Sequence, residues 1–182
     1  MPTDGFITSF NQTLPIYADK AFIANTFSSS LYNKINENVV GAAKFYASAI
    51  NGINDDDVRI SKRRNLSTSR LRGFESGKVG PKDGNDFIGG NYITSFSASS
   101  SIPKILENSQ NLDVLIFYDA ASIWGVDYDS AIDDNSKIRS SVGLGVDWFT
   151  VIGPLNFSLA HPLTKSSTDI TETFRFNLGT TF

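Results

Sequence analysis

Apolar and polar residues alternate along most of this chain, and the alternation is most regular over residues 171–182. In an extended strand successive side chains point to opposite faces, so this pattern gives one apolar face and one polar face. A soluble protein rarely ends on such a strand, because the apolar face must be covered. A barrel wall in lipid provides that cover; the alternative is an edge strand of a soluble sandwich. The apolar face would carry Phe174, Phe176, Leu178, Thr180 and Phe182.

The same period of two predicts eight strands, and no segment has sustained helical periodicity. Gly153-Pro154 is expected to form a turn and Pro162–Asp169 a loop. The order of strands and turns indicates an all-β fold, an antiparallel up-and-down meander. The expected strands are Phe6–Ile16, Ala21–Asn33, Val39–Ile50, Phe87–Ile102, Leu112–Trp124, Ile138–Trp148, Leu155–Ala160 and Thr171–Phe182.

Three features favour a transmembrane barrel over a soluble sandwich. Several expected strands have about ten or more residues, the length that a tilted strand needs to cross a bilayer. The connections are expected to be short after the first and seventh strands and long after the third. Charged residues lie on the faces opposite the apolar ones, as in a water-filled lumen. They are Lys44, Asp119, Arg139, Asp147 and Arg175.

Composition narrows the chemistry further. The absence of cysteine excludes disulfides, thiolate metal sites and a cysteine nucleophile, and a single histidine excludes a metal site with several histidines. The net charge of −3 gives no reason to expect nucleic acid. No run of about eighteen apolar residues occurs, so a membrane-spanning helix is not expected. The first residues lack the pattern of a signal peptide. With no nucleophile–base pair or metal cluster in the pattern, we expect neither an enzyme nor a cofactor.

One long segment, residues 51–86, interrupts the alternation with many charged residues and glycines. A connection of this length inside a compact domain is usually functional or disordered. Composition alone slightly favours a solvated surface loop, so this alternative stays open.

Several short motifs identify a family when they are taken in order. The long segment contains Leu71-Arg72-Gly73-Phe74, and Gly89-Gly90-Asn91, Phe117-Tyr118-Asp119, Gly153-Pro154-Leu155 and Phe174–Gly179 follow. An Arg-Gly-Phe tripeptide alone would be weak evidence, but the ordered set is specific. The chain resembles, nearly from end to end, the C-terminal half of the barrel of the BamA-type outer-membrane protein assembly factors. These belong to the wider bacterial surface antigen superfamily of assembly and translocation barrels.

The resemblance implies roles for the long loop. In the family this loop folds back into the lumen, and its arginine reaches acidic groups on the inner wall. Arg72 would hold that position here, with Asp119 as its carboxylate partner, through charge-assisted bonds. Gly73 would allow a close approach of the backbone, and Phe74 would pack against the wall. Relatives can carry a second acidic partner on the preceding strand, where this chain is expected to have Ser99.

The resemblance also implies a role for the last strand, whose key residues would be Phe174, Phe176, Leu178, Gly179 and Phe182. In the family such a strand is recognised for insertion and closes the barrel against the first strand. Recognition by β-augmentation would use backbone bonds for affinity and alternate side chains for specificity. Gly179 would weaken the pairing and permit a kink.

The family barrel has sixteen strands, about twice the number expected here. We therefore expect residues 1–182 to be the C-terminal part of a larger barrel domain, with an open curved sheet whose edges are Phe6–Ile16 and Thr171–Phe182. The alternatives are a split half or a small barrel that closes on itself. The resemblance implies an outer-membrane location, unfolded outer-membrane β-barrel proteins as substrates, and accessory lipoproteins and the missing barrel half as partners. A translocation role, or a small structural or pore protein, remains the alternative function.

Overall fold

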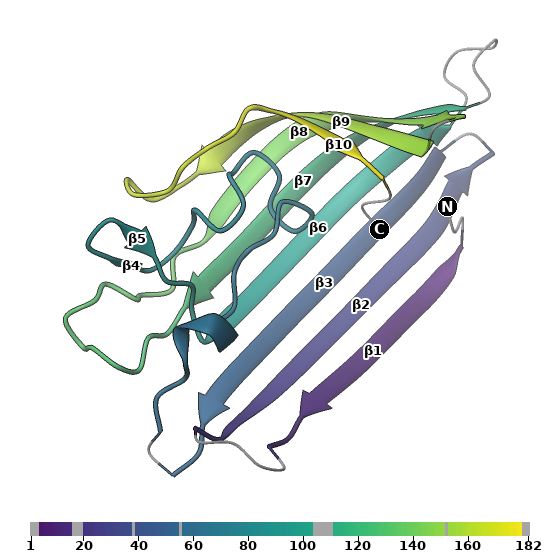
Figure 1. Cartoon of the computed structure of the whole chain (residues 1–182). Coiled ribbons are helices and arrows are strands. Elements are labelled where there is room, and N and C mark those ends of the chain that lie inside the picture. The colour runs from purple at the N-terminus through teal and green to yellow at the C-terminus, as the bar shows by residue number, and fades with distance from the viewer. Residues whose placement is uncertain are drawn as a thin grey trace.

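The computed structural model describes residues 4–15, 20–37, 39–54, 56–103, 111–151 and 153–179. Eight of its strands form one antiparallel sheet, in which each of the eight pairs with the next of the eight along the chain (Figure 1). This is the all-β up-and-down meander that the alternation predicts. The strands are, in sheet order, β1 (Gly5–Thr13), β2 (Phe22–Asn36), β3 (Val39–Gly52), β6 (Tyr92–Pro103), β7 (Leu112–Trp124), β8 (Arg139–Thr150), β9 (Gly153–Thr164) and β10 (Phe174–Leu178).

The long connection between β3 and β6, residues 53–91, is called here the β3–β6 loop. It contains a short 3₁₀ turn, η1 (Ile60–Lys62), and a hairpin formed by β4 (Lys82–Asp83) and β5 (Asp86–Phe87). Among the described residues, no helix is long and apolar enough to cross a membrane. In Figure 1 the loop folds over one face of the sheet instead of extending away from it.

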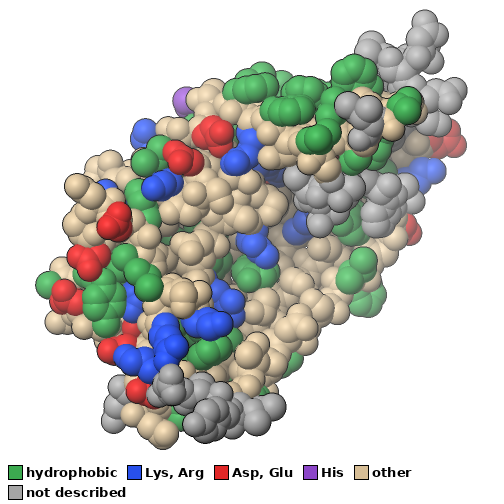
Figure 2. Space-filling model, viewed as in Figure 1, with side chains coloured by type: hydrophobic (Ala, Val, Ile, Leu, Met, Phe, Trp, Pro, Cys, Tyr) green, Lys and Arg blue, Asp and Glu red, His purple; other side chains and the backbone are tan. Residues whose placement is uncertain are grey.

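The two faces of the sheet differ in polarity, as the alternation predicts. The outer face is covered by exposed apolar side chains, while the inner face carries the charged residues named above together with many serines. Figure 2 shows Lys and Arg side chains within the hollow of the molecule. A face this apolar would be costly in water, because a soluble monomer rarely exposes so large a patch. The exposed residues include Phe10, Phe27, Phe45, Phe96, Leu144, Leu159, Phe174 and Phe176.

The lengths of the connections vary along the sheet, but the short turns do not follow the first and seventh strands, where the sequence predicted them. In an up-and-down sheet all odd-numbered connections lie at one end, so the first, third and seventh cannot be contrasted with one another. The short turns are those after β2, at residues 37–38, and after β8, at residues 151–152. The long β3–β6 loop lies at the opposite end, together with the β9–β10 connection, residues 165–173. Short turns at one end and longer loops at the other are typical of outer-membrane barrels.

Most strand boundaries differ from the predicted ones by a few residues; β10, for example, is Phe174–Leu178 where Thr171–Phe182 was predicted. Three of the differences bear on the loops and turns. Phe87 belongs to the β4–β5 hairpin, so the wall strand β6 starts only at Tyr92. Gly153 is already paired with Thr150 across the sheet, so it opens β9 and is not part of the turn. Pro162 lies within β9, opposite Ser141, where a bulge adjusts the register. Proline is tolerated there because its missing N–H need not point at a paired strand.

The sheet is open in the part of the chain that the structure describes. The sheet order ends at β1 on one side and at β10 on the other, and these two strands are not paired with each other. The edges are therefore the strands that were expected to form them. Every residue of β1 is exposed, whereas β6 and β7 contribute buried residues to a cluster with the β3–β6 loop.

Candidate functional site

The β3–β6 loop is anchored to the inner face of the sheet by an apolar cluster. Phe74 is only 1% exposed and is the largest side chain in this cluster. The loop supplies four of the residues, and β6 and β7 supply the other three. Burial of each large apolar side chain stabilises the docked loop by about 1.5–3 kcal/mol. The cluster consists of Leu66, Leu71, Phe74, Val79, Ile93, Ala121 and Ile123.

Arg72 binds Asp119 with the fork geometry that the guanidinium group favours. Its Nε donates to Oδ2 of Asp119 at 2.8 Å, and its Nη2 donates to Oδ1 at 2.8 Å. The backbone N–H of Arg72 donates to Oδ2 as well, at 3.1 Å. The Asp119 side chain is fully buried, whereas that of Arg72 is 21% exposed. Two parallel charge-assisted bonds fix the orientation as well as the distance of the arginine.

The side chains around this pair were not identified from the sequence. The guanidinium carbon of Arg72 lies 3.5 Å from the ring centroid of Phe117, which also points inward from β7. Gly143 on β8 makes room for that ring, because a Cβ there would lie 2.4 Å from it. Ser141, also on β8, donates its hydroxyl to the backbone carbonyl of Arg72 at 2.5 Å. The alternation does place Phe117, Ser141 and Gly143 on the same face of the sheet as Asp119. It does not show which residues of that face lie next to Arg72.

Ser97, not Ser99, occupies the position next to the Arg72–Asp119 pair. Both serines point inward from β6, but the register places Ser97 directly opposite Asp119. Its hydroxyl donates to Oδ1 of Asp119 at 2.7 Å and accepts from Nη2 of Arg72 at 3.2 Å. The serine therefore completes the hydrogen bonding of the carboxylate without adding charge, and Arg72 has one carboxylate partner among the described residues.

Gly73 and Phe74 follow Arg72 with the backbone close to the wall. Gly73 has a φ of 89°, and a Cβ there would lie 3.0 Å from the Cβ of Ala160 and 3.3 Å from that of Ser141. Both the left-handed conformation and the close approach favour glycine. Phe74 forms an isolated antiparallel bridge with Thr171 in the β9–β10 connection.

Two further Arg–Asp pairs fix the loops, one to the sheet and one to another loop, and the sequence pattern predicted neither. Arg139 of β8 binds Asp169 in the β9–β10 connection, with Nε–Oδ2 at 3.0 Å and both side chains buried. Arg63 binds Asp127, in the connection between β7 and β8, at 2.7 Å. These partners are separated by many residues in the chain, and nothing periodic in the sequence connects them.

The carboxyl group of Asp127, in the β7–β8 connection, has a lowered pKa. Burial alone would raise its pKa, but hydrogen bonds from the N–H of Val58 and the amide of Asn91, together with the charge of Arg63, lower it below 3.8. The carboxylate is therefore kept ionised, and it links the start of the β3–β6 loop to the β7–β8 connection.

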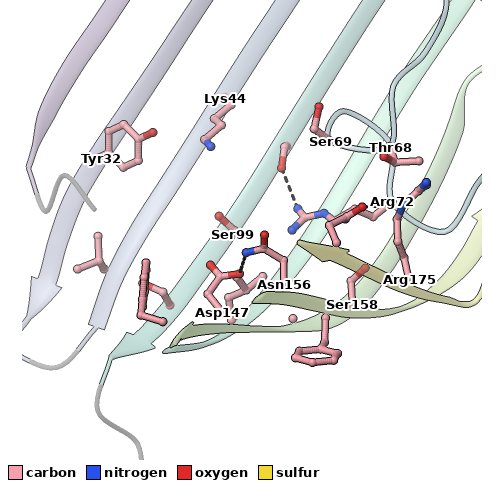
Figure 3. A pocket seen from close by; sticks show the side chains of 18 of the residues that line it. Tyr32, Lys44, Thr68, Ser69, Arg72, Ser99, Asp147, Asn156, Ser158 and Arg175 are labelled. Carbon is pink, nitrogen blue, oxygen red and sulfur yellow. Dashed lines mark hydrogen bonds between the residues drawn. The ribbon is translucent and has the colours of Figure 1, made fainter. Parts of the chain in front are cut away.

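Beside Arg72 the inner face borders a cavity of about 490 Å³ (Figure 3). Three of the five charged residues predicted to face a lumen, Lys44, Asp147 and Arg175, line it together with Arg72. Arg139 does not line this cavity, because its guanidinium group is held by Asp169. A dashed contact in Figure 3 joins the amide of Asn156 to Asp147 at 2.6 Å.

The residues singled out on the last strand lie on its outer face or just beyond its end. Phe174, Phe176 and Leu178 are all more than half exposed, and the ring of Phe176 packs on Phe157 of β9 at 5.1 Å. Gly179 follows β10 with a φ of 115°, and its N–H donates to the carbonyl of Pro154 at 2.8 Å. Phe182 lies outside the described residues.

Comparison with known proteins gives a consistent result. A family model, described as the Omp85 superfamily domain, matches residues 1–182. The BamA assembly factor of Neisseria meningitidis is 32% identical over 143 residues, covering 62% of this chain and 17% of that protein. The BamA of Neorickettsia risticii is 27% identical over 187 residues, covering all of this chain and 25% of that protein.

A solved structure supports the same relationship. The crystal structure of BamA from Haemophilus ducreyi lacking POTRA domains 1–3 matches with a TM-score of 0.84 and 29% identity, covering 96% of this chain and 38% of that one. This chain thus spans a quarter or less of the length of these two curated relatives. Its eight-stranded sheet corresponds to part of a larger barrel wall, which accounts for the apolar outer face. The chain belongs to the Omp85 superfamily of integral outer-membrane β-barrel proteins.

Proposed function

We propose that this chain is the C-terminal part of the barrel of an outer-membrane protein assembly factor of the BamA type. Its role would be to help fold and insert other β-barrel proteins into the outer membrane without covalent chemistry. The remaining strands of the barrel would pair with β1 and β10, which are the two edges of this sheet. Unpaired backbone groups in hydrocarbon cost several kcal/mol each, so both edges need partners in the membrane.

The observation that carries the proposal is the fork of Arg72 on Asp119 inside the hollow of the sheet. A structural barrel or a simple pore has no evident need for a loop that is folded inward and fixed to one carboxylate. The names of the relatives point the same way, since three of them are called assembly factors. A further relative is a SAM50-like protein of Schizosaccharomyces pombe, 28% identical over 129 residues.

The substrates would be unfolded outer-membrane β-barrel proteins, and accessory assembly lipoproteins would act as partners. The five-residue strand β10 suits transient pairing with a substrate strand, because a short edge exchanges partners at low cost in backbone hydrogen bonds. The turn-like backbone at Gly179 would allow β10 to bend away from its neighbour. No nucleic acid, metal or cofactor enters this proposal.

The test replaces Arg72 by Ala in the full-length protein and measures the amounts of folded outer-membrane proteins in cells. The matched control is Arg70→Ala, two residues away in the same loop, since Arg70 stacks on Tyr46 at 3.7 Å and makes no ion pair among the described residues. We expect a loss of folded outer-membrane proteins for the Arg72 variant only. Normal amounts, with the variant barrel itself folded, would contradict an assembly role for the loop. A selective defect in polypeptide export would favour the translocation alternative.

A further inference from the structure

The last strand is much shorter than the strand with which it pairs. β9 continues to Thr164, but β10 begins only at Phe174, opposite Leu159. The final backbone contact along this ladder runs from the N–H of Ala160 to the carbonyl of Thr173, at 2.9 Å. Beyond it the β9–β10 connection leaves β9 and crosses toward the β3–β6 loop (Figure 1). Within the described residues, the end of β9 beyond Ala160 therefore has no strand partner on its β10 side.

Pro162 explains why the ladder stops at this point. The N–H of Ala160 points toward β10, and alternate residues of a strand direct their N–H groups to the same side. The register between Gly143–Ala160 and Ser141–Pro162 is regular, so position 162 should supply the next donor. Proline has no N–H to give. Continued pairing of the connection with β9 would thus leave the carbonyl of Thr171 without its donor.

The connection pairs with the β3–β6 loop instead. The N–H of Glu172 donates to the carbonyl of Gly73, and the N–H of Glu75 donates to the carbonyl of Ile170, both at 3.0 Å. The N–H of Ile170 donates to the carbonyl of Lys78, also at 3.0 Å. These bonds begin at the residue after Arg72. A short two-stranded pairing therefore joins the loop motif to the residues just before β10.

Asp169 fixes one end of this pairing. Its carboxylate accepts from Nε and Nη2 of Arg139 at 3.0 and 3.1 Å, and from the N–H of Gly80 at 3.3 Å. It also accepts from the N–H of Ser166 at 2.6 Å. Both charged side chains are buried. One carboxylate thus connects a wall strand, the β3–β6 loop and the connection itself, and loss of either charge would leave the other buried without a partner.

We propose that residues 169–172 form a clasp, which makes the docking of the loop motif and the pairing of β10 with β9 depend on each other. Asp169 and Arg139 are its positioning residues, and Pro162 keeps the clasp from pairing with β9. Coupling of this kind is reciprocal. An event that withdraws Arg72 from Asp119 loosens β10, and an event that opens β10 loosens the loop. The inference concerns conformation and does not depend on the proposed assembly function.

The test is hydrogen exchange of the full-length protein in lipid nanodiscs, followed by mass spectrometry of its peptides. For Asp169→Asn we expect at least tenfold faster exchange in three places: the clasp, residues 73–78 of the loop, and residues 174–178 of β10. The matched control is Asp133→Asn, which removes an exposed ion pair with Lys137 in a neighbouring connection and should leave all three unchanged. Faster exchange confined to the clasp would overturn the coupling.

Two further variants test the coupling by changing the β3–β6 loop and strand β9 instead of the clasp. Arg72→Ala should accelerate exchange of residues 170–172, although it changes no residue of the clasp; unchanged exchange there would overturn the proposal.

Pro162→Val, at an unpaired edge, should still fold if the Asp169 variant does not. It restores the missing donor, so we expect slow exchange of the new backbone amide at position 162 and exchange at least fivefold faster at Glu75. Fast exchange at position 162 with a fully protected loop would show that the proline does not direct the clasp.

Discussion

Replacement of Asp119 by Asn is the sharpest single test of how the loop is docked. The substitution keeps the shape of the side chain but removes its charge and turns one acceptor oxygen into a donor amide. In the wild-type protein the carboxylate accepts three bonds from Arg72 and one from Ser97, and it has no access to water. An asparagine offers one acceptor oxygen to these four donors. At least one N–H of Arg72 must then face the N–H of the new amide.

The magnitude follows from burial. Breaking a fully buried ion pair by removal of one partner costs about 3–5 kcal/mol. Arg72 is 21% exposed, so water can partly satisfy it after the change, and a value at or below the lower limit, about 2–3 kcal/mol, is appropriate. At about 1.4 kcal/mol for each factor of ten, this raises the population of the undocked loop by roughly 30- to 150-fold. Asp119→Glu should also be destabilising, because the Asp119 side chain is fully buried and an extra methylene group there would overpack the site.

The assay is limited trypsin digestion of the full-length protein, with the cleavage sites identified by mass spectrometry. The loop contains the trypsin sites Arg70 and Arg72, which are protected while the loop is docked. When opening and closing are fast, the cleavage rate follows the population of the open form. We expect cleavage after these two residues to accelerate tens of times or more in Asp119→Asn. An acceleration of less than about threefold would show that the ion pair does not determine the docking of the loop.

Three further predictions concern other parts of the molecule. Gly73→Ala should accelerate the same cleavage more than Gly77→Ala does, because both have positive φ but only Gly73 is close to the wall; equal effects would exclude the close approach as the cause. The lowered pKa of Asp127 means that its contribution to stability is complete above pH 3.8 and is lost as the pH falls through the lowered value. Asp127 accepts a hydrogen bond from the backbone N–H of Val58, so hydrogen exchange of that N–H, after correction for intrinsic rates, should be constant between about pH 5 and 8. A change within that range would contradict the lowered pKa of Asp127. Leu159→Arg on the lipid face should destabilise the barrel by about 2–4 kcal/mol, while Ser158→Arg on the inner face should cost far less, as measured by urea unfolding in vesicles; equal costs would contradict the assigned faces.

The strands could be predicted from the sequence because their signal is local. Alternation over a few residues defines a strand and its two faces, and the paired register then follows from neighbouring strands. The errors occurred where the local signal misled. Pro162 was interpreted as a loop residue, although a proline is compatible with a strand that has a free side. Phe87 and the glycines after it resembled a wall strand, but Phe87 belongs to a hairpin inside the loop and the glycines precede β6.

The contacts of the loop could be predicted only in part. The resemblance pointed to Arg72 and Asp119, which the structure brings together. It could not choose between Ser97 and Ser99, because both have the same parity and only the cross-strand register separates them. The pair of Arg139 and Asp169 left no trace in the sequence pattern. Such a pair forms because the folded chain leaves two opposite charges in one buried space, and that space exists only after the sheet has curved.

Apolar and charged contacts make different contributions to the position of the loop. The cluster around Phe74 supplies most of the favourable free energy, several large side chains at about 1.5–3 kcal/mol each, but apolar contacts tolerate small shifts. A buried ion pair adds little net stability, because desolvation offsets most of its attraction, yet a misplaced charge there costs several kcal/mol. The apolar cluster therefore keeps the loop inside the sheet, while Arg72 and Asp169 determine where along the wall it docks. It follows that loss of Asp119 should raise the population of the undocked loop by the factor given above, whereas Phe74→Ala, at about 3–5 kcal/mol, should raise it further even with every ion pair intact.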